Sequence, residues 1–158
     1  MKKYGLIALA VIVLDQITKA YVREFPLGET FFEMPGLLSL THCVNSGAAF
    51  SMLSGHPALL AFLSLALLAL IWTYAVKKLR LSVAGWAAFA CLVGGGVGNL
   101  LDRLLFSGVT DYIRLRFIDF PVFNLADIAI TGSIAVLLIL LFTDTLEEPL
   151  EDKHGSDG

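Results

Sequence analysis

The sequence has few charged residues and very few cysteines or histidines. Only 16% of its 158 residues are Asp, Glu, Lys or Arg, whereas 57% are hydrophobic. This balance excludes a water-soluble enzyme, a disordered chain and a collagen-like chain. The 11 basic residues are outnumbered by 14 acidic ones. We therefore expect no nucleic-acid partner, because binding to phosphates needs a basic surface.

The two cysteines and three histidines form no pattern typical of a redox or metal site. Cys43 falls in a polar connection and Cys91 near the middle of an apolar stretch, so a disulfide would join different depths of a membrane. We expect both to be small buried hydrophobic residues. His42, His56 and His154 lack metal-ligand spacing and a suitable serine, which argues against metalloproteases and serine proteases. We predict no metal and no cofactor.

Four apolar stretches account for most of the chain: residues 4–22, 57–76, 83–106 and 122–143. Each has about the 20 residues that a helix needs to cross a bilayer. We predict a membrane all-α fold with four transmembrane helices, forming a single integral membrane domain over residues 1–143. Residues 144–158 carry six carboxylates and one lysine. They are expected to form an acidic, disordered tail.

Basic residues that flank the stretches indicate the orientation. Five fall on one face in a four-span layout: Lys2, Lys3, Lys77, Lys78 and Arg80. Because such flanks stay in the cytoplasm, both termini are predicted to be cytoplasmic. Four fall on the opposite face and weaken the bias: Arg23, Arg103, Arg114 and Arg116. The loops 23–56 and 107–121 are then extracytoplasmic, and alternation over residues 38–41 predicts a small β or loop region between the first two helices.

Charged residues inside the apolar stretches require an explanation, since each costs on the order of 3 kcal/mol in hydrocarbon. Asp15 and Lys19 have the i, i+4 spacing of a helical ion pair, and they either neutralise each other or support a site. Asn99, Asp102 and Arg103 occupy one helical turn. Asp102 can cap the helix, pair with Arg103 or bond a loop, and Arg103 can hold a carboxylate or peptide carbonyls. The adjacent glycines permit close approach of a helix or a ligand.

Asp111 and Asp127 have no basic residue at helical spacing, and both fall near the outer ends of helices. If they meet in a partly dry place, repulsion and burial raise one pKa, so that the pair shares one proton. Such a pair is the machinery of an aspartic protease. Structural hydrogen bonding and proton or ion transport are the alternatives that the spacing leaves open.

At these residues the sequence resembles the bacterial lipoprotein signal peptidases, or type II signal peptidases. Five blocks match in order, together with the four-span layout over residues 4–143. They are Asp15–Lys19, Asn45–Ser51, Gly94–Arg103, Gly108–Tyr112 and Phe123–Asp127. The resemblance implies an intramembrane aspartic endopeptidase of the bacterial cytoplasmic (inner) membrane, active at the extracytoplasmic face. It also implies cleavage of diacylglyceryl-modified prolipoproteins just before their lipid-modified cysteine.

The resemblance assigns the catalytic pair to Asp111 and Asp127, and not to Asp102. Substrate-binding or supporting roles are implied for eight residues: Asn45, Gly47, Asn99, Arg103, Asn124, Ala126, Asp15 and Lys19. The implied partners are lipid-modified prolipoprotein signal peptides and membrane lipids, and the protein is expected to be a monomer. The segment from Phe25 to Phe50 is expected to form a wall or lid.

Two other functions fit an apolar chain with intramembrane acids. A proton-coupled carrier needs carboxylates at the membrane midplane or across it, whereas the acids here favour the outer half of the predicted spans. A non-catalytic assembly factor would tolerate amides at both Asp111 and Asp127. A cleavage assay with a lipid-modified precursor peptide separates these classes.

Overall fold

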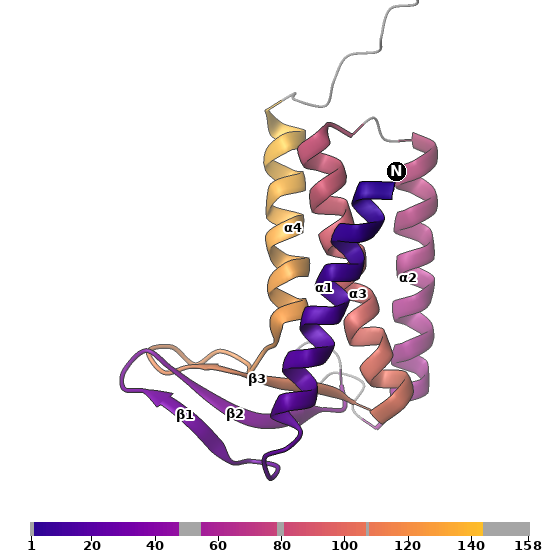
Figure 1. The fold of residues 1–158 in the computed structure, drawn as a ribbon. Helices are drawn as coiled ribbons and strands as arrows, with labels where there is room; N and C mark the ends of the chain where they lie inside the picture. Colours follow the sequence, from indigo (N-terminus) through magenta and orange to yellow (C-terminus); the bar gives the residue numbers. More distant parts are fainter. Residues whose placement is uncertain (1, 48–54, 79–80, 107, 144–158) are drawn as a thin grey trace, which may run out of the picture.

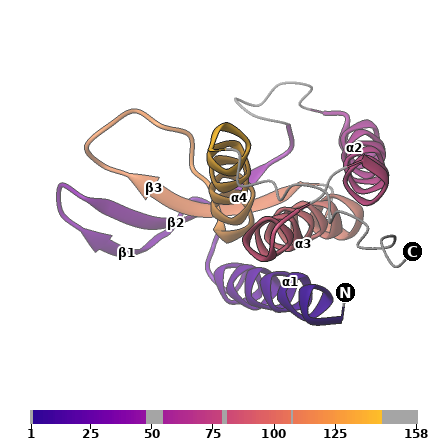
Figure 2. The same ribbon diagram turned by 90° about the horizontal axis from the view of Figure 1, so that it is seen from above.

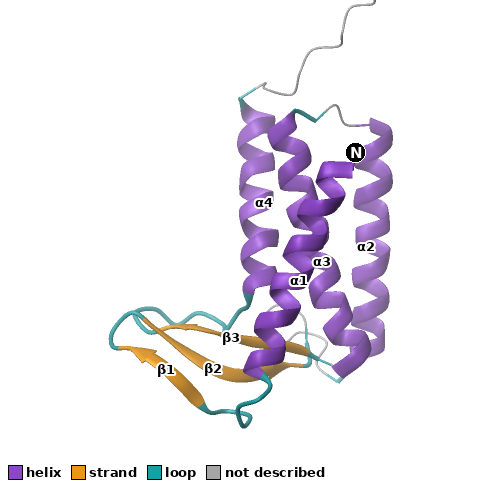
Figure 3. Ribbon diagram, viewed as in Figure 1, coloured by secondary structure: helices purple, strands orange, loops and turns teal. Residues whose placement is uncertain are grey.

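The chain forms a four-helix bundle with a small sheet at one end (Figures 1 and 3). The computed structural model describes residues 2–47, 55–78, 81–106 and 108–143. Its elements in chain order are α1 (Lys2–Val22), β1 (Thr30–Met34), β2 (Leu38–Asn45), α2 (Pro57–Lys78), α3 (Val83–Phe106), β3 (Val109–Leu115) and α4 (Leu125–Phe142). The expected acidic tail, Arg80 and the second half of the block 45–51 lie outside the described residues.

The four predicted membrane spans are confirmed as helices. Within the described ranges, α1, α2, α3 and α4 are each long and apolar enough to cross a membrane. Many of their leucines, including Leu6, Leu67 and Leu138, are exposed on the bundle surface. Exposed leucine is the expected surface of a helix whose solvent is lipid. The start of α1 and the end of α4 lie at the end of the bundle away from the sheet (Figure 1).

Helix α3 occupies the centre of the bundle and packs against the other three helices (Figure 2). Its successive glycines face different neighbours. A Cβ atom on Gly94 would lie 2.8 Å from the Ala8 carbonyl oxygen of α1, and one on Gly95 would lie 2.6 Å from the Ala126 carbonyl oxygen of α4. The glycines thus permit close helix packing, the first of the two roles considered from the sequence.

The sheet combines strands from two separate connections, with β1 and β2 between α1 and α2 and β3 between α3 and α4. Its strand order is β1-β2-β3, and both pairs are antiparallel. Residues 38–41, where a strand is predicted, form the first half of β2. Strands β1 and β3 were not predicted, and β3 belongs to the connection between α3 and α4. The predicted β region between the first two helices is therefore completed by a strand from elsewhere, which brings Cys43 opposite Asp111.

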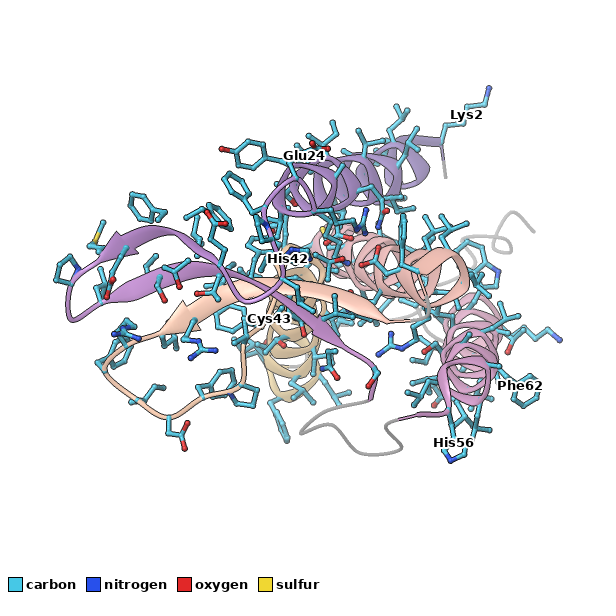
Figure 4. The ribbon with its side chains drawn as sticks, turned by 90° about the horizontal axis from the view of Figure 1, so that it is seen from below. Lys2, Glu24, His42, Cys43, His56 and Phe62 are labelled. Carbon is cyan, nitrogen blue, oxygen red and sulfur yellow. The ribbon has the colours of Figure 1, made fainter. Side chains whose placement is uncertain are left out.

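The cysteines differ from the prediction in burial. Cys43 and Cys91 are free, and both are half-buried rather than buried. Cys43 lies on β2, beside the buried His42, whose Nδ1 is 2.7 Å from the Phe25 carbonyl oxygen. Figure 4 looks along the bundle from the sheet side and shows His42 and Cys43 on the sheet, with His56 far away beside α2.

Candidate active site

A cavity of about 560 Å³ lies where α3 and α4 meet the sheet. Besides Thr131 of α4, its polar lining comes from five residues with charged or amide side chains on four elements: Asn45 of β2, Asn99 and Arg103 of α3, Asp111 of β3 and Asp127 of α4. Its remaining walls are mostly apolar and include the segment 120–123 and the first turns of α4. All five polar residues are among the candidates identified from the sequence.

Asp111 is held in the wall of this cavity by strand β3, and only 4% of its surface is exposed. One carboxylate oxygen, Oδ1, accepts a hydrogen bond of 2.6 Å from Asn124 Nδ2. Burial and the nearby charge of Asp127 raise the pKa of Asp111 to about 7, against the lowering effect of hydrogen bonds from Asn124 and Asn45. This carboxyl therefore changes its protonation state near neutral pH.

Asp127 is fixed by the local sequence at the start of α4. Asn124 is the N-cap residue, and its side-chain oxygen accepts the Asp127 backbone N–H at 2.9 Å. The Asp127 carboxylate in turn accepts the Asn124 backbone N–H at 3.2 Å, which completes a capping box. An acidic residue in the first turn also suits the positive end of the helix dipole. The second oxygen, Oδ1, accepts a bond of 2.8 Å from Asn99 Nδ2.

Two side-chain amides link the two carboxyl groups. Asn124 Nδ2 donates to both Asp111 and the Asn99 oxygen, which is 3.2 Å away. The same Asn99 oxygen accepts a bond of 2.8 Å from Lys19 Nζ. Because an ammonium group only donates, Lys19 fixes the orientation of the Asn99 amide and turns its N–H₂ group toward Asp127. Each carboxyl is thus approached by an amide whose orientation is determined.

A cluster of four charged residues lies behind this amide pair. Lys19 Nζ is 2.8 Å from Asp15 Oδ2 and 3.5 Å from Asp102 Oδ2, and Arg23 Nη2 is 2.7 Å from Asp102 Oδ1. The first three side chains are fully buried. Two cations balance two anions, as a buried cluster requires. The predicted i, i+4 pair of Asp15 and Lys19 is confirmed as an ion pair.

The structure decides between the alternatives for Asp102. This carboxylate bonds the connection after α3, because its Oδ2 accepts the Thr110 backbone N–H at 2.8 Å, and its cationic partners are Arg23 and Lys19. The sequence reasoning did not identify Arg23 as a member of the site. Its position four residues after Lys19 on the same helical face was the signal for it.

Arg103 and Asn45 both line the cavity and both bond to Gly47. Arg103 donates to the backbone oxygens of Asn99 and Gly47, at 3.2 and 3.4 Å. Its buried Nε has no hydrogen-bond partner among the described residues. The Asn45 side-chain oxygen accepts the Gly47 backbone N–H at 2.9 Å. Arg103 therefore retains an unused donor at the cavity.

Five other candidate residues do not line the cavity: Gly47, Asn124, Ala126, Asp15 and Lys19. Asn124 donates a hydrogen bond to Asp111, and Lys19 donates one to Asn99. Ala126 is fully buried between α4 and α3, and its N–H donates to Asp15 Oδ1 at 3.1 Å. These residues support the arrangement of the cavity wall.

Comparisons with known proteins agree with this architecture. Residues 7–143 match the family model described as signal peptidase (SPase) II. The lipoprotein signal peptidase of Synechocystis sp. is 40% identical over 134 residues, which cover 84% of this chain and 83% of that protein. The lipoprotein signal peptidase of Gloeobacter violaceus is 42% identical over 137 residues, covering 86% of this chain and 79% of that protein.

Two solved structures, both described as bacterial membrane enzymes, have the same fold. One has a TM-score of 0.84 at 28% identity and covers 99% of this chain and 96% of its own. The other has a TM-score of 0.81 at 30% identity, with coverage of 91% and 95%. A match over nearly the whole bundle extends the similarity from sequence to fold. The chain is therefore a multi-pass bacterial membrane protein that belongs to the signal peptidase II family, the peptidases that remove signal peptides from prolipoproteins.

Proposed function

We propose that this chain is an intramembrane aspartic endopeptidase with Asp111 and Asp127 as its catalytic pair. Its substrates are diacylglyceryl-modified prolipoproteins, which it cuts just before the lipid-modified cysteine. The observation that carries the proposal is that carboxyl groups from separate elements line one cavity and share an amide network. The raised pKa of Asp111 supports a pair that holds one proton at neutral pH.

The proposed reaction is hydrolysis by this singly protonated pair. The ionised carboxyl takes a proton from a water molecule, and the water oxygen attacks the scissile carbonyl carbon while the other carboxyl donates its proton to the carbonyl oxygen. When the tetrahedral intermediate collapses, one of its hydroxyl groups returns a proton to the carboxyl that donated one, the C–N bond breaks, and the proton taken from water passes to the leaving nitrogen. The two carboxyl groups titrate as a unit, so the proton belongs to the pair.

Substrate binding is assigned to the other polar residues of the cavity. The free Nε of Arg103 suits a backbone carbonyl, because a signal helix that unwinds locally exposes unpaired carbonyls. Asn45 and Asn99, which line the same cavity, are proposed to contact the same extended segment. Gly47, Asn124, Ala126, Asp15 and Lys19 are proposed to support these groups from behind. The segment 25–50 is proposed to form a wall or lid over the substrate.

The proposed site lies at the extracytoplasmic face of the cytoplasmic membrane. Lys2, Lys3 and Lys77 are exposed at the ends of α1 and α2 that lie away from the sheet (Figure 1). Basic flanks of this kind remain in the cytoplasm, so the sheet and cavity face outward. There the lipid chains of a precursor stay in the bilayer while the bond to be cut reaches the cavity. We propose a monomer with one domain over residues 1–143 and a cytoplasmic tail over 144–158.

A proton-coupled carrier is less well supported. Such a protein needs ionisable groups along a path that reaches both faces of the membrane. The acidic residues of the four helices are Asp15, Asp102 and Asp127, all toward the sheet end of their helices. The helical segments nearer the other face contain no acid. A relay across the bilayer therefore has no acidic groups on which to continue.

The test uses purified protein in detergent micelles with a lipid-modified precursor peptide. Asp111→Asn and Asp127→Asn each keep the side-chain volume but remove proton exchange, so cleavage should fall by about 10²-fold to 10⁴-fold or more. Thermal unfolding should stay close to that of the unaltered chain. Mass spectrometry of the product should find the lipid-modified cysteine at its new N-terminus.

Asp119→Asn is the matched control, because Asp119 is an exposed acid after β3 that does not line the cavity. It should cleave at the normal rate. A doubly amidated Asp111 and Asp127 variant that processes precursor at normal speed would falsify the aspartic mechanism and favour the non-catalytic assembly factor.

A further inference from the structure

Arg23 connects α1 to the part of the sheet that carries Asp111. It directly follows α1, and its side chain is largely buried, with 21% exposed. Nη2 lies 2.7 Å from Asp102 Oδ1, and Nε donates to Thr110 Oγ1 at 3.0 Å. The guanidinium carbon lies 3.9 Å from the centre of the Phe106 ring. Both bonded partners and the ring are held by one planar group, a geometry that Lys cannot reproduce.

These contacts fix the strand immediately before the reactive carboxyl. Phe106 ends α3 and Thr110 is the second residue of β3, so Arg23 contacts the helix and the strand together. Asp102 strengthens the connection, because its Oδ2 accepts the Thr110 backbone N–H at 2.8 Å. Thr110 is therefore held through its main chain by Asp102 and through its hydroxyl by Arg23. The next residue along the strand is Asp111.

We propose that Arg23 is a positioning residue for Asp111, acting through Asp102 and Thr110 to hold the start of β3 at its depth in the cavity wall. Arg23 does not line the cavity and touches neither carboxyl of the pair. This inference rests on the proposed aspartic mechanism. Without Arg23, the strand start loosens and water gains access to the Asp111 carboxyl.

The pH dependence of cleavage distinguishes this role from a purely electrostatic one. The charged groups facing Asp111 are Asp127 of α4, Arg103 of α3 and Lys19 of α1, and an Arg23 variant leaves all three in place. Burial is the main cause of the raised pKa of Asp111, so hydration lowers that pKa toward its ordinary value. Loss of a nearby positive charge alone would raise it. Hydration and the loss of a positive charge therefore shift the pKa of Asp111 in opposite directions.

The principal variant is Arg23→Met, which keeps a long unbranched side chain but removes the charge and both hydrogen bonds. With the lipid-modified precursor peptide in micelles, kcat should fall about tenfold to a hundredfold while KM stays within about twofold. The alkaline limb of the pH profile should move to lower pH. Hydrogen exchange of residues 109–115 should become faster.

Two further variants keep the test decisive if Arg23→Met folds poorly. Thr110→Val preserves the strand and the backbone N–H but removes the hydroxyl that Arg23 Nε contacts. Arg23→Lys preserves the positive charge but has no Nε to donate. Both should lower kcat, and their double variant should lose less than the product of the two single effects, because both remove the same bond. Arg116→Met is the matched control: Arg116 pairs with Glu33 on the sheet and is about half exposed.

The proposal is overturned if the alkaline limb of the Arg23 variants stays in place or moves to higher pH. It is equally overturned if the Arg23 variants change kcat and the hydrogen exchange of residues 109–115 no more than Arg116→Met does. Failure of the aspartic mechanism gives a different result, because Asp111→Asn then remains active. Inactive Asp111→Asn together with unaffected Arg23 variants refutes only the positioning role.

Discussion

Adjacent glycines in α3 provide a test of how the first turn of α4 is held. A Cβ atom on Gly95 would lie 2.6 Å from the Ala126 carbonyl oxygen and 3.0 Å from Ile130 Cγ1, both in α4. A Cβ atom on Gly96 would lie 2.6 Å from Leu68 Cδ2 of α2, the far end of a flexible side chain. Both glycines lie in α3, so an alanine at either position raises helix propensity by the same amount. Gly95→Ala and Gly96→Ala therefore differ mainly in which neighbouring atoms the new methyl group displaces.

The magnitude for Gly95→Ala follows from the contact distance. Real Cβ atoms essentially never approach another heavy atom closer than 3.0 Å, so the Ala126 backbone must move by at least 0.4 Å. Overpacking of about 1–3 kcal/mol is opposed by about 1 kcal/mol of helix propensity, which leaves a net loss of about 0–2 kcal/mol. Since a 1 Å misplacement costs about 10²-fold in rate, a shift of this size next to Asp127 should slow cleavage about five- to tenfold.

Gly96→Ala should behave differently, because the Leu68 side chain can rotate away. Its stability should equal or exceed that of the unaltered chain, with cleavage unchanged. The assay is kcat for the lipid-modified precursor peptide, together with thermal unfolding in the same micelles. Equal effects of the two alanines, or normal cleavage by Gly95→Ala, would show that this contact does not position the end of α4 that carries Asp127.

Two further predictions concern the carboxyl pair and its amides. Because burial raises the pKa of Asp111 to about 7, kcat/KM should decline above roughly pH 7 as the shared proton is lost. Since the pKa of this carboxyl is also above its ordinary value of 3.8, its contribution to stability is full below about pH 4 and falls as the pH rises to about 7. Asp111→Asn should abolish this pH dependence in thermal unfolding. Asn124→Ser should keep the helix cap, since serine is a good N-cap residue, but lose the amide that donates to Asp111 and Asn99. Cleavage should then fall about tenfold to a hundredfold at nearly unchanged stability. If cleavage and stability fell in proportion, the Asn124 amide would act on stability and not on the carboxyl pair.

The spans and the candidate residues were predictable because their signals are local. Hydropathy over about 20 residues identifies a helix in lipid whatever it packs against. The i, i+4 spacing of Asp15 and Lys19 predicted their ion pair, and the motif blocks indicated Asp111 and Asp127 as candidates for one site. Asn124 three residues before Asp127 is likewise a local capping pattern, although the sequence reasoning did not use it.

The sheet and the support behind the site were not predictable in the same way. Strand β3 carries an acidic and a basic residue, Asp111 and Arg114, and no clean alternation, and it becomes a strand because β2 pairs with it. Strand pairing is decided by tertiary context more than by intrinsic preference. The partners of Asp102 were left as alternatives because Lys19 comes from α1, Arg23 from the residue directly after α1, and Thr110 from β3.

By itself, the sequence determined that this is a membrane protein with four apolar helices and that the acids of those helices lie toward one end of the bundle, since hydropathy and helical spacing depend only on neighbours along the chain. The tertiary structure alone decided how the carboxyl groups are presented to the cavity. The direction of the Asn99 amide depends on Lys19 of α1, and the position of β3 depends on Arg23, which directly follows α1; each lies 80 or more residues before its partner in the chain. Contacts of this kind exist only after the helices have packed, because no local pattern specifies which distant charge a buried group will meet.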